Sequence, residues 1–153
     1  GFDFMKGLHS NINQYTKSGS APIKAAGRGE TTIGIVFMHD AVKQAVKGFP
    51  VKVVAPAEGT GYEIGSMSII DGARNMKEAK AFYDWALSAD AQNLALEVNA
   101  FQVPSNTGAK TSESAPDMSS IKLIDYDFKT YGSSATRKRL LKKWDDEVSV
   151  LAQ

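Results

Sequence analysis

Cysteine is absent from the 153 residues, and only two histidines, His9 and His39, are present. The lack of cysteine excludes thiolate catalysis, disulfide scaffolds and thiolate zinc sites. Neither histidine belongs to a His-Glu-x-x-His motif or another metal-ligand spacing. The chain also lacks a G-x-S-x-G nucleophile motif, a P-loop and a G-x-G-x-x-G motif. The sequence therefore offers few residues or motifs that are typical of a catalytic site.

Long apolar runs and an excess of charge of one sign are missing too. Every apolar stretch is interrupted before the roughly 18–20 residues that a membrane span needs. The 18 Lys+Arg and 17 Asp+Glu leave a net charge of +1, which gives no general field for nucleic acid or membranes. The chain begins at Gly1 with no signal-like region before it, so we expect a processed, tagged or trimmed product.

The composition is that of a globular protein, with 42% hydrophobic residues. The pattern of the first half predicts β/α units. Short runs that are rich in β-branched residues, or that alternate apolar and polar residues, are separated by turns rich in glycine and proline. The run at 31–37 is almost uncharged, which is typical of a strand covered on both faces. The predicted strands are 11–16, 31–37, 49–54 and 62–70, and the predicted helices are 21–28 and 39–47.

From Asn75 onward the pattern is mainly helical. Asn75 and Glu78 have the spacing of a capping box, and Ser88 begins a second helix in a new register. Residues 101–117 contain two prolines and read as a surface connection. A short strand is predicted at 121–126 and a last helix from 133 or 134 to 150, where basic and acidic side chains four residues apart favour a solvated, self-paired face over a nucleic-acid patch.

The turn at residues 17–22, Lys-Ser-Gly-Ser-Ala-Pro, is the first candidate site. A turn that opens a helix presents free backbone N–H groups, here with two hydroxyls beside them, and such a start can bind an anion. Gly19 would let a ligand approach the backbone closely. The alternative is that Ser20 serves only as the helix N-cap.

His39 and Asp40 form the second candidate site. They follow a predicted strand and open a helix, where open α/β sheets place ligand-contacting residues. The alternative is that Asp40 caps the helix and His39 is an ordinary surface residue. Glu58 and Glu63 lie in and after a glycine-rich loop, where a carboxylate can accept hydrogen bonds from sugar hydroxyls and Tyr62 can stack.

Several motifs together resemble the type II periplasmic substrate-binding proteins of ABC transporters, and most closely the branch of the ferric-ion-binding proteins. The resemblance covers nearly the whole chain. Its motifs are Ala-Gly-Arg-Gly-Glu at 26–30, Gly-Ala-Arg-Asn at 72–75, Trp-Ala-Leu-Ser at 85–88, Ala-Gln at 91–92 and Val-Pro-Ser-Asn at 103–106.

The resemblance implies an α/β fold with two lobes joined by crossing strands, of which this chain is the C-terminal half. Residues 1–60 would form part of the second lobe, and residues 61–153 the crossing strand and the return into the first lobe. It further implies a periplasmic location, a membrane permease as partner, and either the missing N-terminal half or a second copy of the chain to complete the exposed sheets. No nucleic-acid partner and no cofactor are expected.

The ligand expectation rests on a departure from the ferric-ion binders. Where that branch carries two adjacent tyrosines, this chain has Phe-Met-His-Asp at 37–40. Relatives of this kind bind phosphorylated sugars or phosphonates, so we expect a phosphorylated solute such as a hexose phosphate and no enzymatic turnover. The expected phosphate ligands are Ser18, Gly19, Ser20 and Ala21, and the expected hydroxyl readers are His39, Asp40 and Glu63.

Two alternatives remain open from the sequence. In the first, the protein is a ferric-ion receptor in which Tyr62, His39 and a carboxylate such as Glu58 ligate the ion, with a synergistic anion at residues 18–20. In the second, it is a phosphatase or sugar-phosphate isomerase that uses His39 and Asp40 as acid and base.

Overall fold

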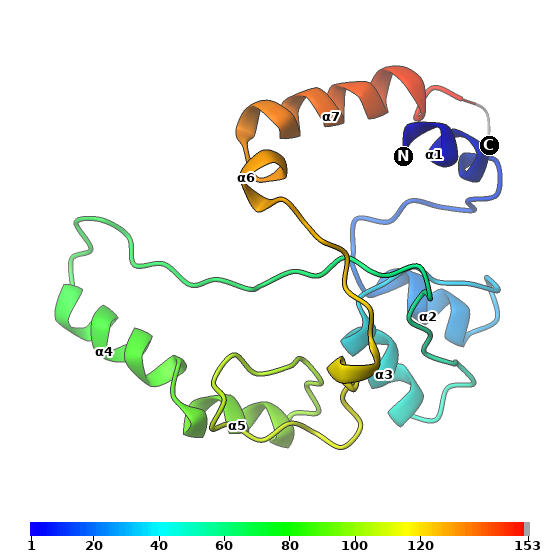
Figure 1. Cartoon of the computed structure of the whole chain (residues 1–153). Helices are drawn as coiled ribbons and strands as arrows, with labels where there is room; N and C mark the ends of the chain where they lie inside the picture. The colour runs from blue at the N-terminus through cyan, green and yellow to red at the C-terminus, as the bar shows by residue number, and fades with distance from the viewer. Residues whose placement is uncertain (152–153) are drawn as a thin grey trace. The chain divides into compact units, whose positions relative to one another are not determined.

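The computed structural model describes residues 1–151 of the chain, and it is helical (Figure 1). Residues 152 and 153 lie outside the described part. The elements in chain order are α1 (Phe2–His9), α2 (Ala21–Gly27), α3 (Met38–Val46), α4 (Met76–Ala86), α5 (Ala89–Glu97), the 3-10 turn η1 (Met118–Ser120), α6 (Phe128–Tyr131) and α7 (Ser134–Glu147).

The helices expected from the sequence are confirmed, although the last one, α7, ends at Glu147 and not at residue 150. The predictions 21–28 and 39–47 correspond to α2 and α3 within one residue at each end. The restart at Ser88 is also confirmed, because its hydroxyl accepts the Ala91 N–H at 3.2 Å and so caps α5. The capping box at Asn75 is wrong: Asn75 is the N-cap residue of α4, but its side chain accepts no capping hydrogen bond. Helices α1 and α6 and the turn η1 were not predicted.

The predicted strands do not form a sheet among residues 1–151. The β pairing there is one isolated parallel bridge between Thr60 and Leu123, in which the Thr60 N–H donates to the Lys122 carbonyl at 2.9 Å. Residues 31–37 are not covered on both faces, since Ile33 and Ile35 are exposed. Figure 1 draws the chain between α3 and α4 as coil. The physical reason is that a strand needs hydrogen bonds from a neighbouring strand, and these segments find no such neighbour among the described residues.

The chain divides into two compact units. Unit 1 comprises Gly1–Lys17 and the segment from Ile124 onward, and unit 2 comprises Ser18–Leu123. Unit 1 encloses Val148, which is fully buried, and His9. In unit 2, α2 packs against α3 and α4 against α5, and the buried apolar residues are Ile23, Ala41, Val42 and Phe101. The expected boundary near residue 60 is a different division, between lobes, and stays a prediction.

Candidate functional site

All seven site residues expected from the sequence belong to unit 2. Four of them form the turn that leads into α2. The Ala21 N–H donates to the Ser18 carbonyl at 3.2 Å, and the Lys24 N–H donates to the Ser20 carbonyl at 3.4 Å. These bonds close the turn. They leave the N–H groups of Gly19 and Ser20 without a protein acceptor among residues 1–151.

The side chain of Ser20 does not cap α2. Ser20 is the N-cap residue, but its hydroxyl accepts no capping hydrogen bond, so the interpretation of Ser20 as a cap alone is not supported. Gly19 lies in open space, because no atom approaches within 4 Å of the position that a Cβ would take. The turn therefore offers two adjacent unpaired N–H groups in an accessible position, an arrangement suited to an anion.

His39 and Asp40 lie side by side in the first turn of α3. The His39 Nε2 and the Asp40 Oδ2 are 3.9 Å apart, and about 31% and 25% of the two side chains remain exposed. The ring of Phe37 stacks on that of His39, with centroids 5.6 Å apart and an interplanar angle of 13°. The packing limits the freedom of the imidazole, while both polar groups stay accessible.

Asp40 is not the cap of α3. The N-cap residue is Phe37, and the helix start has no side-chain capping bond. The carboxylate of Asp40 instead lies within the first turn, where the helix dipole favours a negative charge. A carboxylate accepts hydrogen bonds and an imidazole donates or accepts them, so this pair can recognise a hydroxyl group.

Glu63 is exposed in the extended chain that follows Thr60. Among the described residues it makes no hydrogen bond or ion pair with His39 or Asp40. Of the three expected hydroxyl readers, His39, Asp40 and Glu63, the structure brings only the first two together. The placement of Glu63 in the site stays a prediction.

The described residues contain no group of three or more His, Cys, Asp or Glu side chains that could hold a metal ion. Among the described residues, no hydrogen bond or ion pair links His39 to Glu58, and the ferric alternative requires both as ligands. That alternative therefore gains no support from the geometry.

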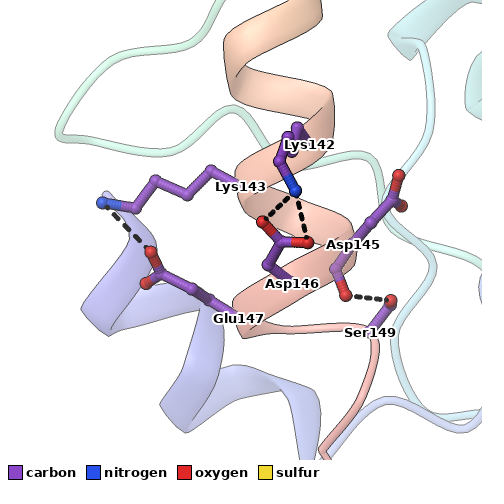
Figure 2. A network of polar contacts seen from close by, with 6 residues as sticks. All are labelled: Lys142, Lys143, Asp145, Asp146, Glu147 and Ser149. Carbon is purple, nitrogen blue, oxygen red and sulfur yellow. Dashed lines mark hydrogen bonds and ion pairs between the residues drawn. The ribbon is translucent and has the colours of Figure 1, made fainter.

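Two basic residues of α7, Lys142 and Lys143, pair with acidic residues of the same helix, as Figure 2 shows. The Lys142 Nζ lies 2.8 Å from the Asp146 Oδ2, and the Lys143 Nζ lies 3.6 Å from the Glu147 Oε1. The hydrogen bond to Asp146 raises the pKa of Lys142 above its ordinary value. The two expected pairs four residues apart are thus confirmed. The absence of a nucleic-acid partner stays a prediction.

An apolar groove on α3 was missed by the sequence reasoning. It has a volume of about 440 Å³ and is lined by Met38, Val42, Ala45, Val46, Val53, Ser114 and Pro116. The spacing of Val42, Ala45 and Val46 is a visible signal for an apolar helix face. Ser114 and Pro116 line the groove because the tertiary fold brings them to α3, and no local sequence pattern predicts this.

The family of the chain follows from its sequence. A family model described as bacterial extracellular solute-binding protein matches residues 1–121. The chain therefore belongs to this family, and the resemblance found from the motifs is confirmed.

Particular relatives agree with this assignment. The chain is 51% identical to the periplasmic binding protein AfuA from Actinobacillus pleuropneumoniae, solved with exogenous fructose-6-phosphate bound; the match covers 98% of this chain and 47% of that one, with a TM-score of 0.91. The periplasmic binding protein P5PA is 41% identical, over 97% of this chain and 47% of that one, with a TM-score of 0.87. An uncharacterised protein of Haemophilus influenzae is 49% identical over 150 residues, which are 97% of this chain and 43% of the relative.

The chain thus spans about half the length of the relatives that it matches. The family is one of extracellular solute-binding proteins, and together with the two solved neighbours it confirms the expected periplasmic location. No helix among the described residues is long and apolar enough to cross a membrane.

Proposed function

We propose that the chain is part of the substrate-binding component of an ABC importer and that it binds a phosphorylated small solute such as a hexose phosphate in a cleft between two lobes. The observation that carries this proposal is the pair of unpaired N–H groups at Gly19 and Ser20. The fructose-6-phosphate bound to AfuA, at 51% identity, supports the same ligand class.

The phosphate is received by the turn before α2. The N–H groups of Gly19 and Ser20 donate to phosphate oxygens, and the hydroxyls of Ser18 and Ser20 add donors on either side. Gly19 and the small side chain of Ala21 leave room for the phosphate to reach the backbone. Because neutral dipoles provide the contacts, binding needs no cationic side chain at this point.

The sugar hydroxyls are read by His39, Asp40 and Glu63. Charged acceptors form the stronger hydrogen bonds, about 1.5–3 kcal/mol each, so Asp40 and Glu63 contribute most to selectivity. Phe37 keeps the His39 ring in one orientation by stacking on it. This role requires binding and release only, which fits a receptor that closes two lobes around its ligand and passes it to a permease.

The division into lobes belongs to the same proposal. Residues 1–60 contribute to the second lobe, and residues 61–153 contribute the crossing segment and the return into the first lobe. The periplasm is the compartment in which such a receptor meets its permease.

Titration calorimetry tests the proposal, using this chain and a form extended to the full length of the relatives. We expect a hexose phosphate to bind the extended form more tightly than inorganic phosphate or ferric citrate does. Asp40→Asn should weaken hexose-phosphate binding by about 10- to 100-fold, which corresponds to about 1.5–3 kcal/mol.

Asp84→Asn is the matched control, because Asp84 lies on α4 and is exposed; it should leave the affinity unchanged. Equal affinities of the parent and Asp40→Asn would remove Asp40 from the site. Preferential binding of ferric citrate, with a visible absorption band, would replace the proposal with iron uptake.

A further inference from the structure

Helix α7 carries three basic side chains that have no ionic partner among the described residues. These are Arg137, Lys138 and Arg139, and all three are exposed. Farther along the helix, Lys142 and Lys143 are paired with carboxylates. Within residues 1–151 the side chains of the first three make no ion pair and no hydrogen bond, so their charge is available to a partner.

The charges of α7 run against the helix dipole. The dipole favours acidic side chains at the start of a helix and basic ones at its end. In α7 the first turn has no acid and the last turn has no base, while residues 137–139 are basic and residues 145–147 are acidic. The start of the helix is capped by the Ser133 hydroxyl, which accepts the Thr136 N–H at 3.2 Å. Since local rules are broken mainly at functional sites, this order indicates that the cations serve a partner and not the helix.

Two of the three free cations share a face with the paired lysines. This face is a surface groove of about 400 Å³, lined by Lys138, Arg139, Lys142, Lys143, Asp146 and Glu147. The two acids of the lining are each held by a lysine, and the exposed Asp145 is not part of it. The face therefore keeps an excess of positive charge.

A lining of this composition suits a charged lipid surface better than a protein. Protein interfaces are built around apolar anchors and are depleted in lysine at their centre. Here, within the described part of the chain, no apolar residue lines the groove and three of the six lining residues are lysines. Anionic headgroups attract clustered Lys and Arg by charge, with no requirement for a complementary shape.

Tyrosines on α6 adjoin the cationic part of α7. Helix α6 packs against α7 and leads directly into it (Figure 1). The rings of Tyr126 and Tyr131 lie 5.4 Å apart and are 37% and 48% exposed. Tyrosine is typical of the headgroup level of a bilayer, because its ring is apolar and its hydroxyl reaches water. These rings suit the same lipid surface.

We propose that α7 attaches the protein peripherally to an anionic phospholipid surface. Arg137, Lys138 and Arg139 contact the headgroup phosphates, and the two tyrosines lie at the headgroup level. The periplasmic location of the family places bilayers next to the protein. This attachment is separate from solute binding and does not depend on it.

Vesicle co-sedimentation tests the proposal with the form extended to the full length of the relatives. The anionic vesicles contain equal parts of phosphatidylglycerol and phosphatidylcholine, and vesicles of phosphatidylcholine alone are the neutral reference. We expect binding to the anionic vesicles only. Raising the salt concentration from about 0.1 M to about 1 M should abolish it, because the Debye length falls from about 10 Å to about 3 Å.

A triple variant locates the surface. It combines Arg137→Gln, Lys138→Gln and Arg139→Gln. Each cation near an anionic bilayer changes the affinity by about fivefold, so this variant should bind the anionic vesicles on the order of 100-fold more weakly than the parent.

The control removes the same charge elsewhere. It combines Arg74→Gln, Lys77→Gln and Lys80→Gln, three exposed residues on α4 and just before it. It should bind the anionic vesicles nearly as well as the parent, because charges more than a Debye length from the lipid are screened.

Thermal unfolding separates a role toward a partner from a structural role. Glutamine has nearly the helix propensity of lysine and arginine, and the removed cations oppose the dipole. The triple variant of α7 should therefore unfold at the same temperature as the parent or at a higher one. Its affinity for a hexose phosphate in solution should be unchanged, which keeps this test apart from that of the proposed function.

Four results would overturn the proposal. The first is equal binding of anionic and neutral vesicles by the parent, or no binding of either at the lower salt concentration. The second is a triple variant of α7 that binds anionic vesicles as well as the parent, and the third is a control that loses as much affinity as that variant. The fourth is tighter binding of a DNA duplex than of vesicles, or a homodimer that the triple variant abolishes, which would assign the face to nucleic acid or to a second copy.

Discussion

Lys6 on α1 donates a hydrogen bond to Glu147 on α7, with 2.7 Å between Nζ and Oε2, although the two residues are 141 positions apart. Figure 1 shows the two helices next to each other within unit 1. This hydrogen bond lowers the pKa of Glu147 below its ordinary 4.5 and raises the pKa of Lys6 above its ordinary 10.5. Lys143, the second cation near Glu147, also places its ammonium 5.0 Å from the Phe2 ring.

The lowered pKa of Glu147 predicts an acid-sensitive unit 1. The folded state binds this proton less readily than the unfolded state, so the stabilisation is present above about pH 4.5 and is lost as the pH falls through the lower, folded-state pKa. Urea unfolding between pH 7 and pH 3, followed by Trp144 fluorescence in a Trp85→Phe background, measures it. Glu147→Gln should flatten the decline in the urea midpoint.

Glu113→Gln, an exposed carboxylate of unit 2, is the control and should keep the full decline. Some pH dependence remains in Glu147→Gln, because hydrogen bonds at the start of α6 also lower the pKa of Asp127. An unchanged pH profile in Glu147→Gln would refute the assignment.

His9 joins three parts of unit 1. It is only 3% exposed, and its Nε2 lies 3.0 Å from the Leu151 carbonyl oxygen while its Nδ1 lies 3.0 Å from the Tyr15 hydroxyl. Because a carbonyl only accepts, the proton of the neutral ring belongs on Nε2, and Nδ1 accepts from Tyr15. Trp144 contacts both rings edge-on.

Truncation of His9 should therefore destabilise unit 1. His9→Ala leaves the Leu151 carbonyl and the Tyr15 hydroxyl without this partner, which costs about 1–3 kcal/mol in the free energy of unfolding. Tyr15→Phe keeps the stacked ring and removes only one hydrogen bond, so its effect should be smaller. Chemical denaturation reported by Trp144 measures both, and equal losses would show that the hydrogen bond between Tyr15 and His9 accounts for the whole effect, so that the Leu151 contact and the His9 ring add nothing.

The helices could be predicted from the sequence because their signals are local. Ser88 and Ser133 each accept an N–H three residues ahead, and that spacing is readable in the chain. The adjacency of His39 and Asp40 is local for the same reason. The strands could not be predicted reliably from local signals, because a strand such as 31–36 needs a hydrogen-bonding partner that is distant in sequence. The position of Glu63 relative to His39 and Asp40 depends on long-range pairing of the same kind.

Two N-cap residues, Ser88 and Asn75, should differ in how much stability is lost when each is replaced by alanine. Ser88→Ala removes the hydroxyl that accepts from the Ala91 N–H, so it should cost about 1 kcal/mol in the free energy of unfolding. Asn75→Ala should cost much less, because the Asn75 side chain makes no capping bond to α4. Urea denaturation of unit 2 followed by Trp85 fluorescence compares them. A larger loss in Asn75→Ala would mean that its side chain caps α4 in solution.

Gly34 couples the exposed segment 31–36 to the proposed phosphate site. A Cβ at this position would lie 2.8 Å from the Pro22 carbonyl oxygen and 3.2 Å from the Ile23 nitrogen. Gly34→Ala must therefore push the segment and the first turn of α2 apart, at a cost of about 1–3 kcal/mol in stability. Gly65→Ala, where nothing lies within 4 Å, is the matched control and should be neutral or slightly stabilising.

The same clash should also reduce ligand binding in the form extended to the length of the relatives. Gly19 and Ser20 immediately precede α2, so displacing its first turn moves the two unpaired N–H groups. We expect the affinity for inorganic phosphate and for a hexose phosphate to fall by a similar factor in Gly34→Ala, because the two ligands share the phosphate contacts. Asp40→Asn should weaken only the hexose phosphate. Calorimetry with both ligands separates the two contributions, and a Gly34→Ala protein that binds inorganic phosphate as well as the parent would place the phosphate elsewhere.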